Sequence, residues 1–145
     1  MQMKLREVMT HPVIRIHPDE TVAVAARMLT HYNVGILPVC GGDGRLCGLV
    51  TDRDLVTRCL ASGRSPANTP VRDIMTAHMI LARSDMDAAE AARLMGREQI
   101  RRLPVVENGK LCGMVSLGDL AVKAESSLDA GGALSEISST LSSRK

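Results

Sequence analysis

Aromatic side chains are almost absent from this sequence of 145 residues. Tyr32 is the only one, since the chain contains no Phe and no Trp. Proteins that bind single-stranded nucleic acid commonly stack the bases on aromatic rings, so the composition disfavours this class. The net charge is only +2 and no block of basic residues occurs, whereas binding to a phosphate backbone needs a concentrated basic face. We therefore do not expect nucleic acid as a partner.

Long apolar runs are also missing, and cysteine is sparse. No run approaches the roughly 20 apolar residues that span a bilayer, and residues 1–6 contain no hydrophobic stretch of the signal-peptide type. The four cysteines (Cys40, Cys47, Cys59 and Cys112) form no CxxC pair and have no closely spaced histidine, which argues against a zinc site. Cys47 and Cys112 are expected to be small buried hydrophobic residues. These features predict a soluble, cytoplasmic protein with free thiols and no bound metal.

One unit of the sequence occurs twice. The matching pairs are Met9-Thr10 and Met75-Thr76, Pro38-Val39 and Pro104-Val105, Cys47-Gly48 and Cys112-Gly113, and Asp54-Leu55 and Asp119-Leu120. The first two pairs recur after 66 residues and the last two after 65, so one residue is lost in the loop at 40–44. A unit of about 65 residues is marginally stable alone. We therefore expect the two copies to share a core and to form two related clefts.

The spacing of apolar residues predicts the order strand, helix, strand, strand, helix in each copy. In the first copy these elements are expected at 13–16, 21–32, 36–40, 46–51 and 52–61. In the second copy they are expected at 79–81, 87–96, 103–106, 111–116 and 117–125, with Asn108-Gly109 as a hairpin turn. We predict an α+β fold with one repeat in residues 1–65 and the other in 66–125. Residues 126–145 form a Ser-rich tail or a short docking helix, since Leu134, Ile137 and Leu141 share helical spacing.

A hydroxyl followed three residues later by a carboxylate ends the second hairpin strand of each copy. The pairs are Thr51 with Asp54, and Ser116 with Asp119. One interpretation is a capping box, in which each pair closes the start of the following helix. The other is a nucleoside site, because a carboxylate can accept hydrogen bonds from both ribose hydroxyls, and a helix N-terminus suits a phosphate. The two interpretations are compatible, and the spacing leaves both open.

Three motifs occur in the same order in both copies. They are Val8-Met9-Thr10 with Ile74-Met75-Thr76, residues 34–39 with residues 100–106, and residues 48–54 with residues 113–119. With these motifs the chain resembles a tandem pair of CBS domains, often called a Bateman module. The resemblance covers roughly residues 4–125. It implies two β-α-β-β-α units that pack through their sheets about a pseudo-twofold axis.

The resemblance also implies a ligand, because many CBS pairs bind AMP, ADP, ATP or S-adenosylmethionine in their clefts. It makes Asp54 and Asp119 ribose acceptors and places Thr51 and Ser116 near the sugar or phosphate. The first strand of each copy often meets the base, which points to the segments Val13-Ile14 and Met79-Ile80. The candidate nucleotide-binding residues are Val13, Pro38, Thr51, Arg53, Asp54, Met79, Ile80, Arg101, Arg102, Pro104, Ser116 and Asp119. The family further implies a homodimer that forms through helices.

The two clefts are expected to differ in their arginines. Arg101 and Arg102 precede the Leu103-Pro104 pair, whereas the equivalent positions in the first copy are Gly35 and Ile36. Guanidinium groups match phosphate oxygens well, although a single arginine is often only a solvated surface charge. The first copy has Arg53 between Thr51 and Asp54 instead. We predict that a phosphorylated ligand prefers the cleft with Ser116, Asp119 and Arg102.

Two classes of function fit the sequence. The first is a regulatory module that binds an adenine nucleotide and signals to a separate partner protein. The second is a scaffold or interaction protein whose clefts are empty or vestigial and whose Thr/Ser-Asp pairs only cap helices. An enzyme is disfavoured, because Thr51 and Ser116 have no recognisable base partner and the sequence contains no Walker loop or Rossmann fingerprint.

Overall fold

The computed structural model describes residues 3–122, which form two compact units. The repeat-1 unit consists of residues 14–79 together with 109–111. The repeat-2 unit consists of residues 3–13, 80–108 and 112–122 within the described range. Each unit combines a small sheet with helices, which confirms the predicted α+β class. The tail predicted at 126–145 lies outside the described residues.

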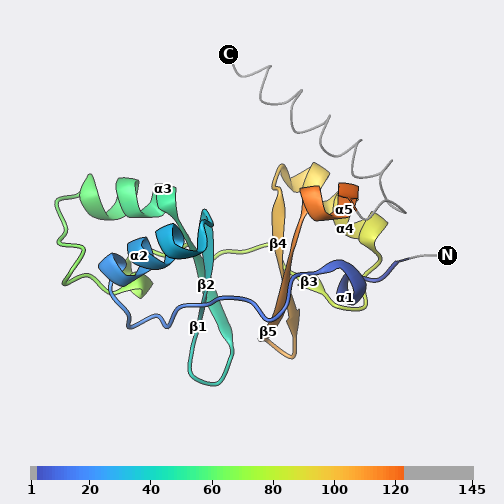
Figure 1. Ribbon diagram of the computed structural model, residues 1–145, viewed down its shortest axis with the longest axis horizontal. Coiled ribbons are helices and arrows are strands. Elements are labelled where there is room, and N and C mark those ends of the chain that lie inside the picture. Colours follow the sequence, from blue (N-terminus) through green and yellow to red (C-terminus); the bar gives the residue numbers. More distant parts are fainter. Residues whose placement is uncertain (1–2, 123–145) are drawn as a thin grey trace, which may run out of the picture. The chain divides into compact units, whose positions relative to one another are not determined.

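In the repeat-1 unit, a two-stranded antiparallel hairpin carries the helices on one side (Figure 1). Its elements are α2 (Val22–Tyr32), β1 (Ile36–Cys40), β2 (Leu46–Thr51), α3 (Asp52–Asp54), the π-helix η1 (Leu55–Leu60) and the 3₁₀-helix η2 (Val71–Asp73). Thr21 caps α2, because its side-chain oxygen accepts a hydrogen bond from the Val24 amide. The positions predicted for α2 and for both strands are confirmed.

The repeat-2 unit has the same plan with a three-stranded sheet in the order β3-β4-β5. Its elements are α1 (Leu5–Val8), β3 (Ala82–Arg83), α4 (Ala88–Glu98), β4 (Arg102–Glu107), β5 (Lys110–Ser116) and α5 (Leu117–Val122). In Figure 1, α4 and α5 lie on the same side of β4 and β5. Asn108 and Gly109 both have positive φ, as a tight hairpin turn requires. The last three residues of the helix predicted at 117–125 lie outside the described range.

Three predicted elements differ in the structure. Residues 13–16 form no strand, since only Ile16 pairs, in a single parallel bridge to Val39. The strand predicted at 79–81 occurs later, as β3, because Ala82 is the residue that meets Val105. In both cases the apolar run begins before the residue that pairs with a neighbouring strand. The helix predicted at 52–61 is present, but it changes from α-type to π-type hydrogen bonding after Asp54.

Each unit contains the segment that leads into the other repeat. Residues 3–10 stand at the start of the first sequence repeat, yet they fold in the repeat-2 unit, where the Leu5 amide donates to the Met86 carbonyl at 2.9 Å. Residues 69–76 fold in the repeat-1 unit, where the Val71 amide donates to the Glu20 carbonyl at 2.8 Å. We call these two stretches the lead segments. The spatial units therefore differ from the sequence repeats in which lead segment they include.

The lead segments explain why the Met-Thr and Cys-Gly pairs occur together in both copies. Thr76 forms an antiparallel bridge with Leu49, and a Cβ atom on Gly48 would lie 2.7 Å from the Thr76 carbonyl oxygen. In the repeat-2 unit, a Cβ atom on Gly113 would lie 2.5 Å from Met9 Sδ. At Gly48 the nearest atom is backbone, so a side chain does not fit there, whereas at Gly113 the flexible Met9 side chain would have to move and the Thr10 carbonyl oxygen would lie at 3.0 Å.

The buried aliphatic residues form two clusters, one in each unit, and not the shared core that the sequence predicted. The repeat-1 core includes Leu37, Val39, Val50, Cys59 and Ile74, all buried. The repeat-2 core is rich in alanine from α4 and includes Leu5, Met95, Leu103, Val105 and Leu120. Both cores contain lead-segment residues. Without Phe or Trp, small and flexible residues supply the close packing that a core requires.

Candidate functional site

The Thr51–Asp54 pair forms a complete capping box at the start of α3. Thr51 Oγ1 accepts a hydrogen bond from the Asp54 amide at 3.1 Å, and Asp54 Oδ2 accepts one from the Thr51 amide at 3.0 Å. Asp54 is buried, with only 7% of its surface exposed. The capping interpretation of this pair is therefore correct. It uses one of the two carboxylate oxygens and leaves Oδ1 for other contacts.

The Ser116–Asp119 pair has the same geometry at the start of α5. Ser116 Oγ accepts from the Asp119 amide at 3.0 Å, and Asp119 Oδ2 accepts from the Ser116 amide at 3.3 Å. Asp119 is half-buried, so its carboxylate is more accessible to solvent than that of Asp54. Within residues 3–122, the hydrogen bond that Asp119 accepts on its side chain involves Oδ2. Both pairs are therefore preorganised without a ligand.

Arg101 is joined to this cap through the main chain. Its carbonyl accepts a hydrogen bond from the Leu117 amide at 2.8 Å, directly after Ser116. In the repeat-1 unit, the Gly35 carbonyl accepts the equivalent bond from the Asp52 amide at 3.2 Å. The side chains of Arg101 and Arg102 are exposed. The structure therefore joins the backbone of Arg101 to the start of α5, while glycine occupies the place of Arg101 in the first copy.

The remaining predicted site residues lie in different elements and in both units. Pro38 and Pro104 are buried inside β1 and β4. Arg53 is exposed on α3. Val13 belongs to the repeat-2 unit and Met79 to the repeat-1 unit, opposite to the copies in which the sequence places them, whereas Ile80 belongs to the repeat-2 unit with Ser116.

Arg58 is a residue of this site that the sequence did not suggest. It follows Asp54 by four residues, and its Nε lies 3.7 Å from Asp54 Oδ1. Its Nη1 also donates to the carbonyls of Ile74 at 3.3 Å and Met75 at 3.2 Å. The i, i+4 spacing on a helix was the available signal for the ion pair. The contacts with the lead segment had no such signal.

Cys40 and Cys112 do not have the environment of reactive thiols. Burial raises the pKa of the Cys40 thiol, although the nearby Arg15 guanidinium partly opposes this effect. Burial also raises the pKa of the Cys112 thiol, and Glu107 adds to the rise. A raised pKa keeps the thiol protonated near neutral pH, and the thiolate is the nucleophilic form. Cys47 and Cys112 were expected to be buried but are only half-buried. Cys40 and Cys59 are buried.

Within residues 3–122, no three His, Cys, Asp or Glu side chains gather as they would around a metal ion. No helix in this range is long and apolar enough to cross a membrane.

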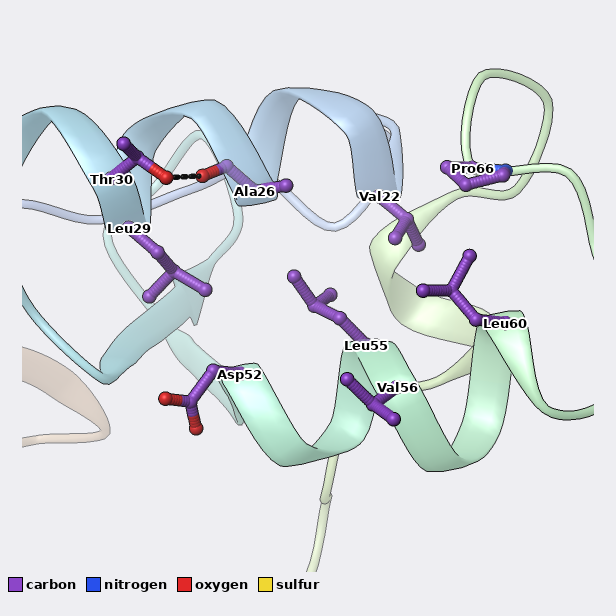
Figure 2. A pocket seen from close by; sticks show the side chains of 9 residues that line it. All are labelled: Val22, Ala26, Leu29, Thr30, Asp52, Leu55, Val56, Leu60 and Pro66. Carbon is purple, nitrogen blue, oxygen red and sulfur yellow. Dashed lines mark hydrogen bonds between the residues drawn. The ribbon is translucent and has the colours of Figure 1, made fainter.

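A separate apolar groove lies between α2 and the α3–η1 segment (Figure 2). Its volume is about 280 Å³. Figure 2 shows Leu29, Leu55 and Val22 pointing into the space between the helices, with Asp52 at one end and Pro66 near the other. The side chains of Val56 and Leu60 border it and are 55% and 57% exposed. None of the predicted nucleotide-binding residues lines this groove.

Comparison with known proteins identifies the repeat. The sequence pattern of the CBS domain matches residues 5–61 and again residues 71–125. The chain belongs to the CBS domain family. It is 40% identical over 134 residues to the CBS domain-containing protein YhcV of Bacillus subtilis, covering 92% of this chain and 94% of that protein. This relative is therefore similar in length to the present chain.

Solved CBS structures share the fold. Hypoxic Response Protein I, solved with two coordinated zinc ions, has a TM-score of 0.76 at 31% identity, over 83% of this chain and 98% of that one. The CBS domain pair of protein MJ0100, in complex with 5′-methylthioadenosine and S-adenosyl-L-methionine, has a TM-score of 0.73 at 25% identity, over 85% and 96%. A hexameric CBS-CP12 protein from bloom-forming cyanobacteria has a TM-score of 0.71 at 28% identity, over 86% and 70%. The fold thus occurs in adenosine-ligand complexes and in oligomers.

Proposed function

We propose that this CBS pair is a regulatory module that binds an adenine nucleoside or nucleotide and signals to a separate partner protein. The observation that carries the proposal is the Ser116–Asp119 cap with Arg101 joined to it through the Leu117 amide. This arrangement combines a preorganised carboxylate for ribose hydroxyls with guanidinium groups that suit phosphate. The adenosine ligands of the MJ0100 CBS pair support the ligand class.

In this proposal, Asp119 and Asp54 accept the ribose hydroxyls, and Ser116 and Thr51 hold these carboxylates in place. Arg101, Arg102 and Arg53 contact the phosphates of AMP, ADP or ATP, or the charged end of S-adenosylmethionine lies near the carboxylates instead. The base packs against aliphatic side chains from the segments at Val13, Pro38, Met79, Ile80 and Pro104, because the sequence offers no aromatic ring there. The protein acts without chemistry of its own, as a cytoplasmic sensor.

A panel of ligands tests this function by thermal unfolding. AMP, ADP, ATP, S-adenosylmethionine and NAD are added separately at increasing concentration. A ligand that binds only the native state stabilises it by about 2.7 kcal/mol at a hundredfold excess over Kd, and the shift grows with concentration. We expect at least one adenine ligand to follow this dependence. If no nucleotide shifts the transition, the sensor function is wrong.

The alternative is a scaffold, and one observation favours it. Both capping boxes are complete without a ligand, so the repeated Thr/Ser-Asp pairs already have a structural role. In that case their repetition requires no binding site. The same ligand panel separates the two functions, because a scaffold gains no stability from any nucleotide.

We also propose that two copies associate through the groove between α2 and η1. The exposed apolar side chains of Val56 and Leu60 border it, and burial of such surface favours association. The CBS-CP12 oligomer supports self-association for this fold.

Sedimentation of the Leu60→Glu variant tests this interface, with Leu81→Glu as a control on another exposed leucine. We expect the wild-type protein and the control to sediment as dimers and Leu60→Glu as a monomer, since a charge in an apolar contact is costly to bury. A Leu60→Glu dimer would refute this interface.

A further inference from the structure

Arg58 makes contacts with two different parts of the repeat-1 unit. On one side, Nε faces Asp54 Oδ1, the carboxylate oxygen that the cap does not use. On the other side, Nη1 donates to the Ile74 and Met75 carbonyls, which belong to the lead segment of the second repeat. A planar guanidinium can face a carboxylate and donate to backbone carbonyls at the same time, because its N–H groups point in fixed, separate directions.

The stretch that Arg58 contacts is the end of the lead segment. Ile74 is buried in the repeat-1 core, and Met75 packs against Gly48. Thr76 then joins β2, where its amide donates to the Leu49 carbonyl at 2.8 Å and its carbonyl accepts from the Leu49 amide at 2.9 Å. Beyond Thr76 the chain continues into the second repeat. A change in the contacts of Arg58 therefore affects the end of the lead segment, from which the chain continues into the second repeat.

We propose that Arg58 is a positioning residue that couples the ribose site at Asp54 to the lead segment at Ile74–Thr76. The proposal rests on the proposed function, because a ribose hydroxyl bound to Asp54 would use the oxygen that Arg58 faces. Ligand binding at this site weakens the ion pair between Arg58 and Asp54. The strength of the hydrogen bonds from Arg58 to the Ile74 and Met75 carbonyls changes as a result. Ligand binding in the first copy is thereby transmitted along the chain toward the second.

The second copy differs at the equivalent position, where the sequence has Lys123. A lysine ammonium is a single point of positive charge on a flexible stem and lacks the planar fork of arginine. We therefore assign the coupling to the first copy. Asp119 keeps the role of ribose acceptor without it.

Hydrogen exchange of the Thr76 and Leu49 amides, which bond to each other's carbonyls next to the residues that Arg58 contacts, reports how well the lead segment is held on β2. Arg58→Met removes the guanidinium and keeps a side chain of similar reach. The matched control is Arg64→Met. Arg64 is similarly exposed, at 45% against 49% for Arg58, and it forms an ion pair with Asp73 of the same lead segment, but it makes no bond to the Ile74 and Met75 carbonyls. An exposed ion pair contributes little to stability, so this control separates the carbonyl bonds from the loss of a surface charge near the segment. Without ligand, we expect Arg58→Met to speed exchange of both amides by about fivefold to tenfold, and Arg64→Met to leave it unchanged.

A second arm adds the adenine ligand that stabilises the wild-type protein most. Saturating ligand should change the exchange of these amides in the wild type and in Arg64→Met, and should leave it unchanged in Arg58→Met. If Arg58→Met does not fold, Arg58→Lys replaces it, since it keeps the charge beside Asp54 but cannot span to both carbonyls.

Two results overturn the coupling while leaving the sensor function intact. One is equal exchange in Arg58→Met and Arg64→Met without ligand. The other is a wild-type protein that binds the nucleotide with no change at Thr76 and Leu49. If no nucleotide binds at all, the proposed function fails and the coupling fails with it.

Discussion

Asp54 and Asp119 accept the same capping hydrogen bond but have different neighbours. Asp54 is buried, and its second oxygen faces Arg58. Asp119 is half-buried, and Arg101 is joined to its cap through the Leu117 amide. A ribose at Asp54 therefore competes with a guanidinium already in place, whereas at Asp119 we expect Arg101 and Arg102 to be available to the phosphate. The carboxylate of the second copy should contribute more to the affinity for a nucleotide.

Isothermal titration of Asp119→Ala and Asp54→Ala with the best ligand of the panel tests this difference. We expect Asp119→Ala to lose about tenfold more affinity, equivalent to about 1.4 kcal/mol. Each variant serves as the other's control, because both lose the carboxylate that closes a capping box. Equal losses of affinity would contradict the predicted preference for the second cleft.

The sequence offered the caps as one of two interpretations, and the structure confirms them, because the Thr51–Asp54 and Ser116–Asp119 contacts join residues three positions apart. Local spacing fixes such contacts through the geometry of a helix start. The bonds from Arg58 to Ile74 and Met75 connect residues 16 and 17 positions apart through a turn and a 3₁₀-helix. Such contacts depend on tertiary packing, which no local pattern encodes.

Strands β2 and β5 share one feature, a glycine opposite a lead segment. In β2, a Cβ atom at position 48 would lie 2.7 Å from the Thr76 carbonyl oxygen and 2.8 Å from Met75 Sδ. The nearest atom is backbone that is itself paired with Leu49, so it cannot move without breaking the bridge. The close approach of strand and lead segment therefore depends on the absence of a side chain.

Substitution Gly48→Ala should destabilise the protein by about 1–3 kcal/mol, the usual cost of overpacking. Gly42→Ala is the matched control, because a Cβ atom there has no heavy atom within 4 Å, and we expect a change within about 0.5 kcal/mol. Urea unfolding of both variants measures the difference. Equal stability of the two would show that the lead segment moves aside without cost.

For the helices and strands, the sequence predicted the type of an element better than its first and last residues. The hairpin strands and α2 have clear apolar periodicity and turn signals, and they are where the pattern predicts. The first strand of each copy was misplaced, because in runs such as 79–81 every residue is apolar and nothing marks the one that pairs. The π-type bonding of η1 likewise has no periodic signature that distinguishes it from an α-helix over six residues.

The molecule as a whole is two units that exchange their lead segments. The repetition predicted two similar units but not the exchange, and the reason is symmetry. Met9 could pack against Gly48 or Gly113, and Met75 against either as well, because the local sequences are nearly the same. Both arrangements satisfy the same motif pairs. Only the path of the chain in three dimensions decides between them.

Separate expression of residues 1–65 and 66–145 should therefore give two unfolded fragments. The first fragment lacks the 69–76 segment, which donates to the Glu20 and Pro18 carbonyls and supplies Val71 and Ile74 to the core. We expect circular dichroism to show no cooperative thermal transition for either fragment and a transition after equimolar mixing. Cooperative unfolding of the 1–65 fragment alone would contradict this expectation.

The exchanged segments also suggest how such a protein could have arisen. A chain with a single repeat has one lead segment and one glycine strand, but within one unit of this architecture they belong to different partners. Such an ancestor would complete its fold only as a dimer in which the two molecules exchange their lead segments. Gene duplication and fusion would place both partners on one chain, at an effective concentration set by the connector and no longer by expression level.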